Sequence, residues 1–486
     1  MSLKYLGKLL ASLLASLLTM PTFAQLKLDL PDTSQLPEMG NPDISTFSPI
    51  NEAALGKQLY RSIRRSRPII EDPELNTWIQ SLGNRLALSS PHATGQLYFA
   101  IENNPAINAH TLLGGVIIIN SGLILSTQSE SELAAVMAHE IAHVSQHHIA
   151  RMLKGNHNNP FLTGLGILAG AVVASQSDKP DVARAIITGT MALQAHNQIV
   201  FSHRAESEAD RIGLRTLTAA HFDPAAMASF LEKLDRQQNN TYGDISKYLR
   251  SHPLTIERLS ETRNLANQLR RSPVQEDSSY AFAREKLAQL TGERSNRLNS
   301  QAPAQLAQYK TALRAFQADQ HDRVMQLLPH PSLSLPQNLL TAAALKQLGH
   351  YPEALQRSRA LQSHYPQHQA LNLLLAEALA GNRQAPQAIP LLLRFASQET
   401  TSTEFLEIAQ RIAQQAGFAA EARLFNAERS IRLGQYEHAQ ATLQGAANLP
   451  SAAPSTAVLI RQRLNDLREM QTEKDRLTNS RTLPTR

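Results

Sequence analysis

The chain has 486 residues, more than one compact core holds, and with 42% hydrophobic and 18% charged residues it has the composition of a folded globular protein. Its formal net charge of +6 is scattered and only 5% of its residues are aromatic, which argues against a nucleic-acid-binding surface. The absence of cysteine excludes disulfides, thiol catalysis and a lipid anchor on cysteine.

The first 24 residues have the pattern of a secretory signal peptide. Lys4 and Lys8 precede a short apolar stretch over residues 9–18, and the small residue Ala24 ends a cleavage motif. An uncleaved membrane anchor is the alternative, but this stretch is shorter than the ~20 residues that a transmembrane helix needs. We therefore expect export and cleavage after Ala24, with no transmembrane span in the mature protein.

The next two segments differ in composition. Residues 25–50 are rich in Pro, Asp, Ser and Thr and are expected to lie extended over the surface. Helical periodicity begins at Asn51, and Asp72 followed by Pro73 marks the beginning of a second helix. We expect a first folded domain over residues 51–270.

Two short stretches predict β-strands, namely GQLYFAIEN and GGVIIINSG. The second contains residues 115–120, which could form a sheet edge to which an extended substrate adds by main-chain hydrogen bonds. An ordinary buried strand is an equally good interpretation of the same residues.

The stretch VMAHEIAHVSQHH suggests a metal-binding helix. Ser129 and Glu132 form a capping box ahead of it. His139 and His143 then lie one turn apart on one helix face, where two imidazoles can bind one metal ion. Glu140 is placed to contact a water on that metal. The alternative is a polar helix with incidental histidines.

Two further histidines follow in the same stretch. A straight helix ending at Lys154 would place His147 ~12 Å from His139 along its axis, too far for both to bind one ion. We therefore expect His147 and His148 to face solvent or to pack against a neighbouring element. The third ligand must come from elsewhere in the chain.

The best candidate for the third ligand lies in HRAESEADRIGL. Glu206 and Asp210 stand at positions i and i+4 of a helix, a face that Glu208 does not share. Glu206 could bind the metal while Asp210 accepts a hydrogen bond from the outer nitrogen of a ligating histidine. The alternative is a charged helix face whose acidic residues pair with Arg204 and Arg211.

Residues 160–176 lie between these two helices and are apolar and rich in Gly and Ala. A run of about 15 apolar residues is short for a membrane span. A core hairpin, a lid over the metal and a membrane-contacting segment all fit this composition.

The last third of the chain predicts a helical repeat domain. After a connecting segment at 271–304, residues 305–470 are rich in Ala, Leu and Gln, and a polar tail follows at 471–486. A Gly-x-Tyr motif typical of tetratricopeptide repeats occurs in two stretches, LGHYPEALQRSRALQSHYP and LGQYEHAQATLQ. The period of such repeats is about 34 residues. An irregular helical bundle is the alternative. Stacked repeats would offer a curved surface to peptides or partner proteins.

The spacing of glycines in this region is uneven. Gly381 follows Gly349 by close to one period of such a repeat. The separation of Gly434 from Gly349 is not a whole number of periods. The repeat register is therefore expected to slip near Gly417.

These features together resemble the zinc metallopeptidases of the CAAX-prenyl-protease and HtpX superfamily. The matching stretches lie within residues 51–265 and are NAHTLLGGVIIINSGLI, SESELAAVMAHEIAHVSQHH, SHRAESEADRIGL and SHPLTIERL. Leu113 stands where the family pattern has proline before two glycines. With a signal peptide in front and repeats behind, the whole chain resembles the periplasmic BepA type.

The resemblance implies a mainly α protein, in which an α+β zincin-like peptidase domain precedes an all-α tetratricopeptide-repeat solenoid. It implies one Zn²⁺ per chain with His139, His143 and Glu206 as ligands. Glu140 would then be the general base, and Asp210 would support a ligating histidine.

The resemblance also places His252, in the His-Pro segment, at the zinc site, with Arg258 in the first turn of the next helix. As a hydrogen-bond donor His252 would stabilise the oxyanion. As a fourth ligand it would hold the enzyme latent, and we lean toward this role. An ordinary loop residue is the alternative.

In function, the resemblance implies an endopeptidase of the periplasm, either free or peripheral to the outer membrane. Its substrates would be misfolded or stalled exported and outer-membrane proteins, and the repeats would recruit these substrates or the assembly machinery. The alternative is a chaperone or scaffold with a mostly latent peptidase. The intact Glu140 favours the enzyme, because a scaffold needs no general base.

Overall fold

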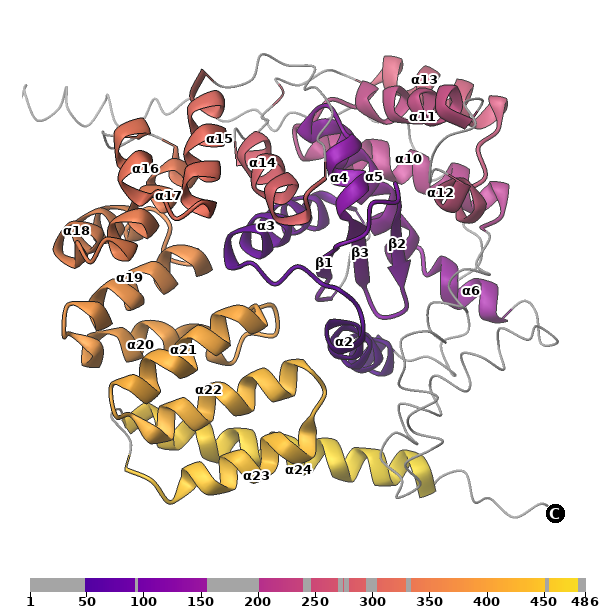
Figure 1. Ribbon diagram of the computed structural model, residues 1–486. Coiled ribbons are helices and arrows are strands. Elements are labelled where there is room, and N and C mark those ends of the chain that lie inside the picture. Colours follow the sequence, from indigo (N-terminus) through magenta and orange to yellow (C-terminus); the bar gives the residue numbers. More distant parts are fainter. Residues whose placement is uncertain are drawn as a thin grey trace, which may run out of the picture. The chain divides into compact units, whose positions relative to one another are not determined.

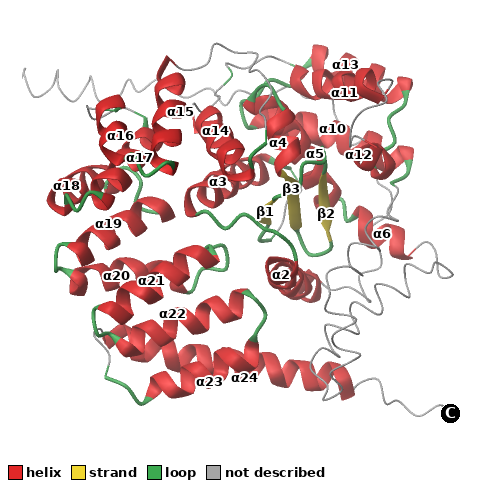
Figure 2. Cartoon of the chain, in the orientation of Figure 1, coloured by secondary structure: helices red, strands yellow, loops and turns green. Residues whose placement is uncertain are grey.

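The chain is mainly helical with one small sheet, as the sequence predicts (Figures 1 and 2). The computed structural model describes residues 49–91, 95–154, 201–238, 246–269, 274, 279–293, 304–328, 334–450 and 454–479. The expected signal peptide at 1–24, nearly all of the segment at 25–50 and the apolar stretch at 160–176 lie outside the described residues.

The sheet has three strands in the order β1-β3-β2, formed by Tyr98–Glu102, Val116–Asn120 and Ala109–Leu112. β1 runs parallel to β3, and β2 runs antiparallel to it. β3 is central, so the prediction that residues 115–120 form an edge strand is wrong and the buried-strand alternative holds. β2 is not predicted from the sequence, because it is only four residues long and carries the polar His110 and Thr111.

Up to residue 268 the described residues form nine helices: α2 (Pro49–Ser66), α3 (Pro73–Ser89), α4 (Ser121–Ser126), α5 (Glu130–Ser145), α6 (His148–Lys154), α10 (His203–Ala219), α11 (Ala225–Gln238), α12 (Ser246–Ser251) and α13 (Ile256–Gln268). Of these, α2, α3, α4 and α5 pack against the strands. α3 begins as predicted, because the Asp72 carboxylate accepts hydrogen bonds from the backbone N–H groups of Glu74 and Leu75. Ser129 caps α5 in the same way by accepting from the Glu132 N–H at 3.1 Å.

Helix α5 is the buried centre of this domain. Every residue from Glu130 to His143 is buried, and the helix packs against α3, α10, α11 and β2. α10 can approach it closely because Gly213 has no side chain: a Cβ there would lie 3.3 Å from the backbone nitrogen of His139. The two helices that carry the candidate ligands are therefore packed directly on each other.

The chain breaks direction directly after α5. α5 ends at Ser145, and His147 adopts a left-handed backbone conformation with φ of 51° before α6 begins at His148. The prediction of one straight helix to Lys154 is therefore wrong. The break turns His148 back toward α5.

Beyond α13, the described residues are almost entirely helical. α14 (Ser279–Thr291) lies within the predicted connecting segment, and ten helices follow: α15 (Ala304–Gln317), α16 (His321–Leu327), α17 (Leu335–Gln347), α18 (Tyr351–Gln362), α19 (Gln369–Gly381), α20 (Ala385–Ala396), α21 (Thr403–Gln415), α22 (Ala419–Arg432), α23 (Tyr436–Ala447) and α24 (Pro454–Asn479). α24 thus continues into the segment predicted as a polar tail. None of the helices in the described parts of the chain has both the length and the apolar character needed to cross a membrane.

The three hairpins from α17 to α22 repeat with an even spacing. Gly349, Arg383 and Gly417 have positive φ angles of 78°, 58° and 80°, and each connects the two helices of a hairpin. They recur along the sequence at the period of about 34 residues that is typical of tetratricopeptide repeats. Gly434 makes the next such turn after half a period. Gly381 instead packs beneath Tyr351, since a Cβ at Gly381 would lie 2.1 Å from that ring.

The loop between α20 and α21 joins the hairpins to the first domain. Arg61 donates two hydrogen bonds to the Glu399 carboxylate, at 2.7 and 2.6 Å. Arg64 donates to the carbonyl oxygens of Glu399 and Thr401, at 3.1 and 2.8 Å. Asn76 donates to the Thr400 carbonyl at 2.7 Å. Both arginines are buried in this joint.

Candidate metal centre

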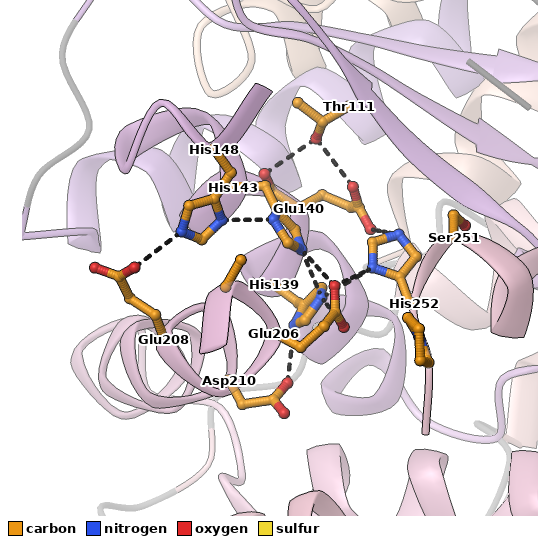
Figure 3. A network of polar contacts seen from close by, with 12 residues as sticks. Thr111, His139, Glu140, His143, His148, Glu206, Glu208, Asp210, Ser251 and His252 are labelled. Atoms are coloured by element: carbon orange, nitrogen blue, oxygen red, sulfur yellow. Dashed lines mark hydrogen bonds and ion pairs between the residues drawn. The ribbon is translucent and has the colours of Figure 1, made fainter. Parts of the chain in front are cut away.

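Three elements bring their polar side chains to one buried point (Figure 3). α5 contributes His139 and His143, α10 contributes Glu206, and His252 follows directly after α12. Each of the four residues is at most 2% exposed. One ligand atom from each lies within 4.8 Å of all the others, the only such group that the described residues form.

The distances within this group are short and regular. The Nε2 atoms of His139 and His143 are 2.9 Å apart. The Glu206 carboxylate lies 3.5 Å from His139 Nε2 and 3.3 Å from His143 Nε2. His252 Nδ1 lies 3.0 Å from Glu206 Oε1 and 3.3 Å from His139 Nε2. Glu206 thus faces both histidines of α5, whereas Glu208 lies outside the group.

The hydrogen bonding of His139 shows which atom it offers to the centre. Its Nδ1 lies 2.9 Å from Asp210 Oδ1, so Nδ1 carries the proton and Nε2 presents a lone pair. A second imidazole nitrogen and a carboxylate face the same point. The two imidazole nitrogens and the carboxylate therefore point lone pairs and negative charge at one another in a buried space. A bound cation would compensate this charge and accept the lone pairs. Imidazole and carboxylate donors suit a divalent transition metal.

Arg258 supports this group from behind. Its Nε and Nη2 donate to the Asp210 carboxylate at 2.6 and 3.0 Å, and its Nη1 lies 2.5 Å from Glu206 Oε2. Burial alone would raise the pKa of Asp210, but Arg258 and the hydrogen bond from His139 lower it below its usual range. Arg258 therefore keeps Asp210 and Glu206 charged. It contacts their carboxylates and is not one of the candidate metal ligands.

Glu140 projects from α5 beside the group and is fully buried. Thr111, on β2, donates to its Oε2 at 2.9 Å, and its Oε1 lies 3.3 Å from His252 Nε2. Burial raises the pKa of Glu140, although His252 and His139 oppose this. A carboxylate whose pKa is raised toward neutrality is suited to take up and release a proton.

Two residues beside the centre were not identified by the sequence analysis. Thr111 lies on the short strand that was missed. His148 was expected to face solvent or to pack against a neighbour, and it packs: it is 3% exposed and its Nδ1 lies 2.7 Å from His143 Nδ1. Phe201 stacks on the His143 ring with centroids 3.9 Å apart. The motif spacing could not reveal His148, because its position depends on the break at His147.

Comparison with known proteins gives a consistent picture. Residues 73–266 match Peptidase family M48. The beta-barrel assembly-enhancing protease of Yersinia pestis is 34% identical over 407 residues, which are 80% of this chain and 82% of that protein. The protein of the same name from Escherichia coli strain K12 is 35% identical over 328 residues, which are 65% and 67% of the two chains. The mitochondrial metalloendopeptidase OMA1 of Arabidopsis thaliana is 31% identical over 153 residues, which are 32% of this chain and 28% of that protein.

Proposed function

Because the chain belongs to peptidase family M48, and within it to the beta-barrel assembly-enhancing type, we propose that it is a zinc endopeptidase that degrades misassembled outer-membrane proteins. The observation that carries this proposal is the buried group of His139, His143 and Glu206 with Glu140 beside it. Three protein ligands and one neighbouring carboxylate are what a zinc peptidase needs.

The chain's own residues account for the proton transfers of peptide hydrolysis. His139, His143 and Glu206 would hold the zinc ion, which would supply a Lewis acid to polarise the scissile carbonyl and to lower the pKa of the attacking water. Glu140 takes a proton from that water as its oxygen bonds to the carbonyl carbon. It then delivers the proton to the nitrogen as the C–N bond breaks, which leaves a carboxylic acid and an amine that ionise to carboxylate and ammonium. Thr111 holds Glu140 in place for both transfers.

An extended substrate can be positioned by β2. β2 is at one end of the strand order and pairs only with β3 among the described strands. Thr111, which contacts Glu140, belongs to this strand. A peptide added along the outer edge of β2 by main-chain hydrogen bonds would therefore pass close to the general base.

His252 is proposed to close the site in its resting state. Its Nδ1 lies within the group of candidate ligands, 3.0 Å from Glu206 Oε1. Its Nε2 is 3.3 Å from Glu140 Oε1, where an attacking water would otherwise contact the base. Tyr248 stacks on its ring with centroids 4.7 Å apart. These contacts support a fourth ligand, which must move away before a substrate can bind.

The remaining parts of the proposal concern place and partners. The signal-peptide pattern at residues 1–24 supports export to the periplasm. The relatives' name, beta-barrel assembly-enhancing protease, supports outer-membrane proteins as clients. The helical hairpins, taken as tetratricopeptide repeats, would recruit the substrate or an assembly partner. The closed position of His252 also favours a second candidate function, a chaperone whose peptidase is mostly latent.

The test is degradation of a urea-denatured outer-membrane β-barrel protein by the purified, zinc-loaded chain. We expect the wild type to cleave the unfolded barrel and to spare the folded one. Glu140→Gln should bind zinc but not cleave, because it loses the base and keeps the ligands. Glu257→Gln, an exposed glutamate on α13, is the matched control and should cleave normally. Cleavage by Glu140→Gln at the wild-type rate would refute the proposed mechanism.

A further inference from the structure

A chain of polar contacts extends outward from His143, on the side of its ring that faces away from Glu206 (Figure 3). His143 Nδ1 lies 2.7 Å from His148 Nδ1. The other ring nitrogen of His148, Nε2, lies 3.1 Å from Glu208 Oε2. Arg151 donates to the same Glu208 oxygen at 3.0 Å. The proposed mechanism uses none of these three residues.

Two helices and the break between α5 and α6 assemble this chain of contacts. His147, whose backbone is in the left-handed conformation, separates α5 from α6. As a result α6 begins with His148 against the His143 ring. Arg151 follows on α6, while Glu208 comes from α10. His148 is 3% exposed, and Phe201 covers the face of His143. The His143–His148 contact is therefore shielded from water, which could otherwise replace it.

The protons in this chain can be arranged in only one way when His143 binds a metal through Nε2. A neutral imidazole has one proton, so His143 carries it on Nδ1. His143 Nδ1–H then donates to His148 Nδ1, which leaves the proton of His148 on Nε2. His148 Nε2–H in turn donates to the Glu208 carboxylate, whose charge Arg151 balances.

We propose that His148, held by Glu208, is a positioning residue that fixes the ring orientation and the tautomer of the metal ligand His143. This inference rests on the proposed metal site. Asp210 supports the other histidine directly, with Arg258 behind it. His143 has the same kind of support with one extra imidazole between ligand and carboxylate, so that Glu208 and Arg151 correspond to Asp210 and Arg258. Both supporting carboxylates come from α10.

Metal affinity measured on the full mature chain tests the proposal. Hydrogen-bond partners of ligating histidines are typically worth 10- to 100-fold in metal affinity. His148→Phe fills the space but accepts no hydrogen bond, so we expect zinc binding, measured by competition with a chromogenic chelator, to weaken by about 10- to 100-fold. His148→Asn offers an amide oxygen to His143 Nδ1–H and should bind within about threefold of the wild type. Equal zinc affinity of His148→Phe and wild type, or equal loss in both variants, would overturn the proposal.

Glu208 provides a second, independent test. Glu208→Gln should weaken zinc binding in the wild-type background, and should have no further effect in the His148→Phe background, because the contact to His143 is already gone. If the losses of zinc affinity caused by the two substitutions add in the double variant, Glu208 does not act through His148, and the proposal is overturned. If His148→Phe does not fold at saturating zinc, as judged by circular dichroism, Glu208→Gln alone decides, and wild-type affinity in that variant overturns the proposal.

Failure of this inference and failure of the proposed function give different results. A wild-type chain that binds no zinc would refute the proposed function itself. A wild-type chain that binds zinc, with His148→Phe equal to it, would leave the metal centre standing and refute only the role of His148. A cobalt-substituted chain adds a readout besides affinity: its visible spectrum should change in His148→Phe, since the geometry of the His143 ligand changes, and should be nearly unchanged in His148→Asn.

Discussion

Among single residues, His252 is the one proposed to close the site. Its ring contacts Glu206 on one side and Glu140 on the other, and both contacts are completely buried. A residue that bridges a candidate ligand and the general base can remain there only while no substrate does. The resting site would therefore be inhibited by its own chain.

Substitution of His252 separates its two possible roles. We expect His252→Ala to cleave substrate and itself faster than the wild type at equal zinc loading, because a competing ligand is removed. An oxyanion donor would give the opposite result, a loss of ~10²–10³ in rate. His438→Ala, an exposed histidine of α23, serves as the control for loss of an imidazole. Slower cleavage, or rates equal to the wild type, would contradict the latency proposal.

The positions of the site residues could be predicted from sequence to different extents. His139 and His143 were placed together by the helical period, and Glu206 was placed with Asp210 by the same spacing. The residue pattern only offered Glu206 as a candidate third ligand, and the resemblance to a known family favoured it over a charged helix face, because no local pattern fixes how two helices far apart in the sequence pack. Thr111 was missed because β2 is short and partly polar.

Among the elements, the break between α5 and α6 has the most consequence for the site. A helix has 3.6 residues per turn, and its continuation past Ser145 would have carried His148 away from His143. The left-handed conformation of His147, with φ of 51°, ends the helix instead. No glycine or proline marks this point in the sequence, which is why a straight helix was predicted.

Residues that resist a left-handed conformation should weaken this break. We expect His147→Val to reduce the free energy of unfolding by about 1–2 kcal/mol, because a β-branched side chain clashes with the backbone at positive φ. His147→Asn, which tolerates that conformation, should stay close to the wild type. Urea unfolding of the zinc-loaded proteins measures both values. A His147→Val protein as stable as His147→Asn would show that the conformation of His147 is not what forms the break.

At the scale of the whole molecule, the first domain and the helical hairpins have separate hydrophobic cores. One core gathers around α3, α5 and the sheet, and another lies entirely within α17–α24. The joint between them is polar and charged, with Glu399 held by Arg61 and Arg64. Because the Glu399 carboxylate is the ion-pair partner of the buried Arg61, the joint depends on its charge.

The joint should therefore respond to pH. Burial alone raises the pKa of Glu399, but Arg432 and Arg61 beside it more than reverse this and lower the pKa to about 2. A lowered pKa means that the charge of Glu399 stabilises the fold fully above its unfolded value of about 4.3, and that this stabilisation is lost as the pH falls toward 2.

Comparison of wild type with Glu399→Gln isolates this effect. We expect the variant to be less stable at pH 7 by up to about 3 kcal/mol, because the buried Arg61 loses its charged partner. The difference between the two proteins should shrink as the pH is lowered from about 5 to 2. Thermal unfolding at a series of pH values measures it, and a constant difference across that range would show that the Glu399 charge does not hold the joint.

Metal content measured together with peptidase activity distinguishes the proposed ligands from the proposed general base. We expect one zinc ion per chain in the wild type and in Glu140→Gln, with cleavage only in the wild type. Glu206→Gln should lose both zinc and cleavage, because it removes a ligand rather than the base. Full zinc content in Glu206→Gln, or cleavage by Glu140→Gln, would contradict the assignment of these residues and with it the account of the site.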